Sequence, residues 1–373
     1  MKKLLLLTAF CILLSACSLQ GASTPAPAPI EMEVLAPPTA QTVTPLTSGE
    51  PIPLTVMTHS SFAISEGALA AFEQANNVKV TFLNGGDAGE ALNKAVLSKD
   101  APLADVFYGV DNTFLSRALE AGIFEPYAST ALANVPAEFR LDPENRATPV
   151  NYGDVCINYD RAFFAKNELP VPTTLGDLIR PEYNGMLVVE NPATSSPGLA
   201  FLMATVAHFG EPGYLDFWRS LRANGLVVVN DWETAYYTNF SASSGRGPQT
   251  MVVSYATSPA AEVIYSEVVI EQSPTGSILG PQTCFRQIEF VGILAGTQRR
   301  AAAERFVDFM LSLTFQEDLP LQMFVLPVDP FAILPDSFYQ FNEYPTDPAI
   351  LAPDVIAANR DRWIQEWTDA VLR

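Results

Sequence analysis

Histidine and cysteine are scarce in this sequence of 373 residues. It holds only two histidines, His59 and His208, and no two cysteines lie close together after Cys17. Zinc and copper sites are usually built from clustered histidine and cysteine ligands, so we expect no such site. Basic residues are few as well, with Lys+Arg at 21 against Asp+Glu at 41. This balance argues against a nucleic-acid partner, which requires a basic face.

Recognisable catalytic motifs are also absent. The sequence has no Gly-x-Ser-x-Gly elbow, no Walker-type phosphate loop and no His-Glu-x-x-His. A discontinuous Ser-His-Asp triad would have to use His59 or His208, and His208 falls late in an apolar segment that suits a structural role. We therefore expect a binding protein that is not an enzyme and needs no cofactor. An exported enzyme or a surface adhesion protein is the alternative from another class.

The one long apolar run lies at the N-terminus. A basic pair opens the chain, Leu4–Leu14 follows, and Leu-Ser-Ala-Cys ends at Cys17. The run is too short to span a bilayer and is typical of a signal peptide. Its ending resembles a bacterial lipobox, so we predict a lipoprotein signal peptide at 1–17, with Cys17 lipidated. The alternative is an ordinary signal peptide with an incidental cysteine. The Pro-rich residues 18–53 predict a tether.

Strands and helices alternate after the tether. Apolar strands are predicted at 54–58, 78–83 and 106–110. A helix follows each one, which is typical of a parallel sheet covered by helices. Ligands bind at the carboxyl ends of such strands, where this order places His59, Asp87 and Asp111. Asp87 also suits the cap of the helix that follows it.

Two later stretches share a strand-to-helix pattern. Residues 251–254 predict a buried strand, and Tyr255 begins a turn that leads to a helix at Pro259, with Ser258 as its N-cap. Residues 187–190 likewise lead through Ser195-Ser196 into a second helix start. Helix starts point free N–H groups at one spot and attract anionic or polar groups. Ordinary capped turns without a ligand are an equally consistent interpretation.

The chain order predicts two lobes. Residues 54–150 predict one α/β unit, and residues 151–284 predict a second. Residues 285–315 return to the first unit. Residues 316–373 predict C-terminal helices that pack on the lobes. Cys156 and Cys284 form an even pair in an exported chain, which favours a disulfide, with two free thiols as the alternative. We therefore expect an α/β fold with a ligand cleft between two lobes.

Several segments carry a family resemblance. They are LTVMTHSSF at 54–62, GGDAG at 85–89, NGMLVVENPATSSPG at 184–198 and RFVDFMLSLTFQ at 305–316. With the lipobox, they resemble class II periplasmic solute-binding proteins of ABC importers, over about residues 50 to 370. VNDWETAY at 229–236 and VVSYATSPA at 252–260 are similar to the thiamine-binding members. The resemblance implies a two-lobed type II fold and an extracytoplasmic receptor that delivers thiamine, or thiamine phosphates, to ABC permease subunits in the membrane. We expect a monomer.

Carried over by position, the resemblance implies a ligand-binding set from both lobes. Asp87 would hydrogen-bond the aminopyrimidine ring, and Trp232 would stand beside the ligand. The set comprises Asp87, Ala88, Ser195, Ser196, Trp232, Tyr255, Ala256, Thr257 and Ser258.

The sequence departs from the thiamine binders at some aromatic positions. His59 stands where they have a tyrosine, and Phe324 stands where they have a tryptophan near a late Pro-Val turn. We keep both residues as candidate ligand contacts. His59 and the Tyr236-Tyr237 pair also leave open a ferric-ion or other small-cation receptor of the same fold. Iron binders, however, place their tyrosine pair in the turn that here begins at Tyr255.

Overall fold

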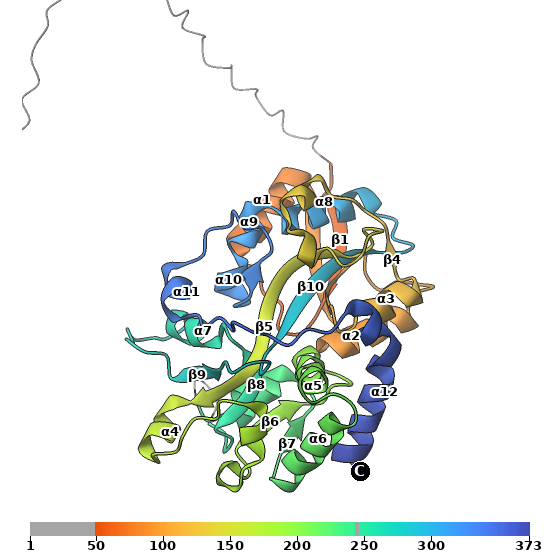
Figure 1. Ribbon diagram of the computed structural model, residues 1–373. Coiled ribbons are helices and arrows are strands. Elements are labelled where there is room, and N and C mark those ends of the chain that lie inside the picture. Colours follow the sequence, from red (N-terminus) through yellow and green to blue (C-terminus); the bar gives the residue numbers. More distant parts are fainter. Residues whose placement is uncertain (1–48, 243–245) are drawn as a thin grey trace, which may run out of the picture. The chain divides into compact units, whose positions relative to one another are not determined.

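A computed structural model describes residues 49–242 and 246–373, so the predicted signal peptide, Cys17 and nearly all of the tether lie outside the described residues. The described chain begins with an α/β unit (Figure 1). Its elements are β1 Ile52–Thr58, α1 Glu66–Asn76, β2 Val78–Asn84, α2 Ala88–Leu97, β3 Val106–Asp111 and α3 Leu115–Ala121. β1 pairs in parallel with both β2 and β3, which confirms the predicted parallel sheet.

Local chemistry sets the helix ends in this unit. Ser65 caps α1 by accepting from the Ala68 N–H, and α1 ends at Asn77 in the left-handed conformation. Asp87 caps α2, as predicted, by accepting from the Ala88 N–H. Asp87 follows the end of β2 closely, so this cap lies at the carboxyl edge of the parallel strands.

Two long antiparallel strands form the middle of the sheet, β5 Thr148–Asp160 and β10 Phe285–Leu294. The strand order is β2-β1-β3-β10-β5-β8-β6-β7. Figure 1 shows β5 and β10 running side by side between the β1 region and the β6–β8 region. The register of β10 shifts after Glu289 against β5 and after Phe290 against β3. Such bulges re-aim side chains, here where the two halves of the sheet meet.

The second half of the sheet carries its own helices. Its elements are α4 Arg161–Lys166, β6 Leu187–Glu190, α5 Ser196–Phe209, α6 Gly213–Ala223, β7 Val227–Val229, the π-helix η5 Thr234–Asn239, β8 Met251–Tyr255, α7 Ser258–Ile264 and β9 Thr275–Ile278. Every residue of α5 from Ser196 to Val206 is buried. A helix that is apolar all round is typical of the core, and α5 packs against the sheet and α6.

The C-terminal segments return across both halves. Their elements are α8 Arg300–Met310, α9 Leu313–Gln316, α10 Leu319–Gln322, β11 Leu326–Pro327, α11 Asp336–Phe341 and α12 Pro353–Val371, while the short β4 Phe124–Glu125 pairs with β10. In α12, Arg360 donates to Ser116 of α3, and the Trp367 ring packs edge-on against Trp218 of α6 at 5.5 Å. Trp363 and Trp367 are 2% and 0% exposed, so both rings belong to the core. The exact lobe boundaries and the packing assigned to 316–373 stay predictions.

Candidate functional site

The carboxyl ends of β1 and β3 bring His59 close to Glu289 of β10. His59 Nε2 lies 3.4 Å from Glu289 Oε1, and the Tyr108 hydroxyl donates to Glu289 Oε2 at 2.8 Å. Gly109 makes this contact possible, because its φ is +110° and a Cβ there would lie 2.5 Å from His59 Cδ2. A larger residue would therefore push the imidazole off the sheet.

The buried charges of this cluster act on each other's pKa. Burial lowers the pKa of His59, but the charge and hydrogen bond of Glu289 outweigh it, so the pKa is raised. Burial raises the pKa of Glu289, yet His59 and Tyr108 bring it below its ordinary value. The pair is thus held as an ion pair. Burial raises the pKa of Asp111 to about 7, against hydrogen bonds from Thr113 that lower it.

Asp87 joins the two halves of the chain. Its Oδ1 accepts from the Ala88 N–H at 2.6 Å, and its Oδ2 accepts from the Trp232 backbone N–H at 3.2 Å. Next to it, the Gly89 N–H donates to the Thr194 carbonyl at 3.0 Å. Burial raises the pKa of Asp87, although the hydrogen bonds that it accepts oppose the shift. The N-terminus of α2 therefore lies against the second half of the sheet.

Trp232 is fixed by three contacts. Its ring stacks on Tyr236 with centroids 5.0 Å apart and planes at 18°, and its indole N–H donates to Ser254 Oγ at 3.0 Å. The Tyr255 ring lies edge-on at 6.5 Å. Tyr236 is in turn hydrogen-bonded through its hydroxyl to Glu262. Trp232, Tyr236 and Tyr255 thus form an aromatic cluster beside Asp87.

The turn after β8 reaches toward the acidic cluster. The Tyr255 hydroxyl donates to Gln287 at 3.4 Å. Burial raises the pKa of Tyr255 well above its ordinary value, and the nearby charges of Glu289, Asp87 and Asp111 raise it further. A side chain from the second half of the sheet therefore faces carboxylates of the first.

The prediction that Ser258 caps α7 was wrong by one residue. The N-cap position is Thr257, which has helical dihedral angles and makes no side-chain hydrogen bond to cap the helix. Ser258 instead shares a hydrogen bond with Ser254 at 3.0 Å, which draws its hydroxyl to β8. Ala256 is buried, and its N–H donates to the Asp154 carbonyl at 2.9 Å.

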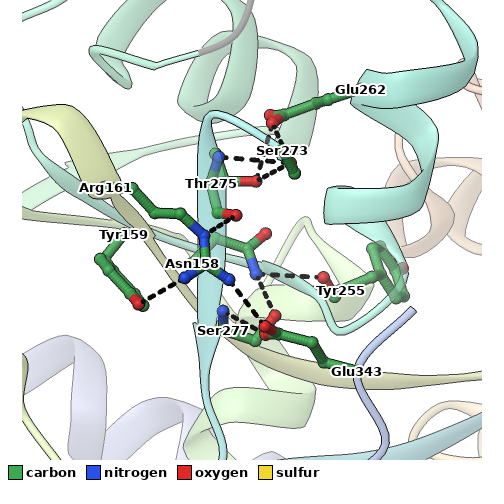
Figure 2. Close-up of polar contacts among 9 residues, drawn as sticks. All are labelled: Asn158, Tyr159, Arg161, Tyr255, Glu262, Ser273, Thr275, Ser277 and Glu343. Atoms are coloured by element: carbon green, nitrogen blue, oxygen red, sulfur yellow. Dashed lines mark hydrogen bonds and ion pairs between the residues drawn. The ribbon is translucent and has the colours of Figure 1, made fainter. Parts of the chain in front are cut away.

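Behind this turn, hydrogen bonds hold β9 on two sides (Figure 2). Glu262 of α7 accepts from the hydroxyls of Ser273 at 3.1 Å and Thr275 at 2.7 Å. Glu343 accepts from the Ser277 N–H at 2.7 Å. These carboxylates anchor β9 to α7 and to the C-terminal segment.

Asn158 of β5 links β9 to the turn itself. Its amide donates to the Tyr255 carbonyl at 3.1 Å and to Ser277 Oγ at 3.0 Å, as Figure 2 shows. Tyr255 is thus fixed at its backbone as well as at its ring. This support was not predicted, because β9 follows no clear apolar alternation.

Several hydroxyls of the predicted set are buried without a hydrogen-bond partner among the described residues. These are Ser195, Ser196 and Thr257, which are 0%, 2% and 1% exposed. Ser195 lies close enough to Asp87 to lower its pKa, but without good hydrogen-bond geometry. Unsatisfied buried hydroxyls are costly, so they suit a place where a ligand is received.

The remaining predicted contacts lie at two places. Ala88 is buried at the first residue of α2, beside Asp87. Phe324 packs its ring on Tyr265 at 4.8 Å, just past the last residue of α7, Ile264. The structure thus places Phe324 next to α7, at the end away from Thr257.

Sequence reasoning missed the polar residues of the central strands. Glu289 and Gln287 lie on β10, Tyr108 on β3 and Asn151 on β5, and all four are buried. One signal was available, because Glu289 interrupts an apolar strand run and a charge there needs a partner.

The Cys156–Cys284 disulfide is present, with the two cysteines 128 residues apart in sequence. It ties the start of β10 to β5, beneath the turn at Ala256. Within residues 49–242 and 246–373, no group of three or more His, Cys, Asp or Glu could hold a metal ion. In the same ranges no helix is both long and apolar enough to cross a bilayer.

Two α/β halves whose polar side chains meet at the strand ends define a carrier that encloses a small solute. Residues 101–364 match the family described as bacterial extracellular solute-binding protein. The chain belongs to this family, which confirms the expected two-lobed α/β binding fold and a binding protein rather than an enzyme. It is an extracytoplasmic solute-binding protein of the kind that serves ABC importers.

Relatives extend this match along most of the chain. The thiamine-binding periplasmic protein of Escherichia coli (strain K12) is 29% identical over 326 residues, covering 86% of this chain and 94% of the relative. A solved periplasmic thiamin binding protein superposes with a TM-score of 0.76 at 27% identity, covering 88% of this chain and 98% of the other. Iron-bound HitA from Pseudomonas aeruginosa has a TM-score of 0.69 at 19% identity, covering 85% and 99%, and shows the shared fold alone.

Proposed function

We propose that this protein binds thiamine, or thiamine phosphates, outside the cytoplasm and delivers it to the permease of an ABC importer. The observation that carries the proposal is the meeting of Asp87 with Trp232 and Tyr255 at the junction of the two halves. The names of the relatives at 27–29% identity support the same ligand.

The chemistry of the site fits a cationic ring system. Asp87, Asp111 and Glu289 are carboxyls, and the basic His59 beside them is already paired with Glu289. A thiazolium would bring the missing positive charge. An aromatic face beside such a cation adds roughly 0.5–2 kcal/mol of attraction, and Trp232 and Tyr255 supply that face.

Several of the predicted contacts then have a defined role. Asp87 accepts hydrogen bonds from the aminopyrimidine, and the start of α5 offers the hydroxyls of Ser195 and Ser196. The turn from Tyr255 to Ser258 closes over the ligand from the second half, with Thr257 free to donate. Ligand that touches both halves binds the closed arrangement better and so favours it.

The location is part of the proposal. A lipid on Cys17 would hold the carrier at the membrane, and residues 18–48 would give it reach toward the permease. Mass spectrometry of the N-terminal peptide from native membranes tests this. A diacylated Cys17 is expected, and an unmodified N-terminus at residue 18 contradicts the anchor.

Thermal unfolding tests the ligand. Purified residues 50–373 are expected to melt higher with thiamine than without it. Asp87→Ala and Tyr255→Ala should each weaken binding by roughly tenfold or more, because each removes a hydrogen bond or aromatic contact. The same measurement with thiamine phosphate shows which of the two forms stabilises the protein more. No shift at millimolar thiamine or thiamine phosphate contradicts the proposal.

A further inference from the structure

Glu190 is a buried acid that has no role in the site described above. It is the last residue of β6 and is 0% exposed, and neither carboxyl oxygen has a hydrogen-bond partner among the described residues. The buried Asp154, by contrast, pairs with Arg286 through two bonds of 2.8 and 2.9 Å. A carboxyl left alone in the interior is costly, so its position calls for a ligand.

The sheet places Glu190 beside the candidate site. β6 pairs in parallel with β8, with Val188 opposite Val252, so the register carries Glu190 to the level of Ser254. Ser254 accepts the indole N–H of Trp232. A Cβ at Gly198 would lie 2.5 Å from the Glu190 carbonyl, so the glycine lets α5 begin directly against this residue.

Two acids, Asp87 and Asp231, act on the charge of Glu190. Burial raises the pKa of Glu190 well above its ordinary value, its own backbone N–H opposes this, and the charges of Asp87 and Asp231 raise it further. Asp87 in turn faces His59, which is paired with Glu289. The charges of these acids therefore favour a positive charge beside Glu190.

We propose that Glu190, with the hydroxyls of Ser195 and Ser196, forms a buried acceptor subsite beside Asp87 for the N–H-bearing end of a cationic ligand. The inference rests on the proposed function and adds a specificity-determining residue to it. An ionised carboxylate only accepts hydrogen bonds, so the ligand must bring the hydrogens, as the amino group of an aminopyrimidine does.

Binding then carries a proton balance. The Glu190 carboxyl holds its proton in the empty site, and the arriving cation stabilises the carboxylate, so the O–H bond breaks and the proton leaves to solvent. The ligand N–H takes its place as the hydrogen-bond donor. Ligand binding should therefore release protons, and part of this release should depend on Glu190.

The test compares thiamine with oxythiamine, in which a carbonyl replaces the amino group. Titration calorimetry on the wild type, Glu190→Gln and the control Glu120→Gln gives both affinities, and two buffers of different ionisation enthalpy give the protons released. Glu120 lies exposed on α3 and undergoes the same change of charge. Gln fits the protonated shape of Glu190, so the melting temperature should be unchanged or higher.

We expect Glu190→Gln to weaken thiamine at least tenfold and oxythiamine less than twofold, and to release fewer protons. A purely structural Glu190 would weaken both ligands equally, and that result overturns the inference, as does an unchanged affinity or proton count. If the wild type binds thiamine, such a result leaves the proposed function intact. If the wild type binds neither ligand, that result refutes the proposed function, and the subsite that rests on it is refuted as well.

Discussion

Gly89 offers a direct test of the contact between the two halves. It is the second residue of α2, and its N–H donates to the Thr194 carbonyl. A Cβ at Gly89 would lie 2.7 Å from Thr194 O and 3.1 Å from Ala193 O, both backbone atoms. Gly89→Ala therefore cannot be absorbed by a side-chain rotation, and the two halves must separate.

The size of the effect follows from these distances. An ordinary contact needs about 3.4 Å, so the backbones must retreat by roughly 0.7 Å. This breaks the Gly89–Thr194 bond, worth about 0.5–1.5 kcal/mol, and stretches the bond from Trp232 to the Asp87 carboxylate, worth about 1.5–3 kcal/mol when lost. Because 1.4 kcal/mol is a factor of ten, thiamine affinity should fall roughly 10- to 100-fold.

A matched control lies on α1. Gly67 is also the second residue of its helix, and a Cβ there meets nothing within 4 Å. Gly67→Ala should leave calorimetric affinity unchanged and should keep or gain stability, because Ala suits a helix better by about 1 kcal/mol. Solution scattering should show Gly89→Ala more open with thiamine present. Equal affinities for Gly89→Ala and the wild type would refute this reasoning.

Two further predictions concern stability. The unfolded chain loses the Asp111 proton near its ordinary pKa of 3.8 while the folded chain keeps it to about 7, so raising the pH across this window should lower the free energy of unfolding, by at most about 4 kcal/mol. Asp111→Asn keeps the acceptor for Thr113, and its stability advantage in urea unfolding should grow from pH 4 to 7; a constant difference would contradict the assignment. Reduction of the Cys156–Cys284 bridge should lower the melting temperature by several degrees, since a loop of this length contributes up to roughly 5 kcal/mol. Cys156→Ala/Cys284→Ala should not respond to reductant, and an equal response in this double variant would place the effect elsewhere.

What the sequence could predict was local. The βαβ order, the cap at Asp87 and the strand before Tyr255 follow from periodicity and turn chemistry. The start of α7 was misplaced by one residue because a serine before proline reads as a cap, whereas the Ser258 hydroxyl bonds to Ser254 instead. That partner lies on the preceding strand, and capping rules consider only the helix.

Apart from the Cys156–Cys284 disulfide, the long-range pairing of side chains was not predicted from the sequence. Tyr108 and Glu289 are 181 residues apart, and Asp87 and Trp232 are 145 apart. Their meeting depends on β10 returning between β3 and β5, and no local pattern specifies this order. Asp87 could therefore be identified, because it caps the helix that directly follows it. The partners and roles of Glu289 and Glu190 could not be assigned, because they depend on distant segments.

The buried acids connect this arrangement to ligand selection. Burial raises the pKa of Asp87, Asp111 and Glu190, so in the proposed carrier closure on an empty site costs free energy for each of these groups that stays ionised. A bound cation lowers that cost by stabilising the carboxylates. Neutral ligands leave the cost in place and do not favour closure. In the proposed function the carrier closes most readily on a cation, because the ligand supplies positive charge beside these acids.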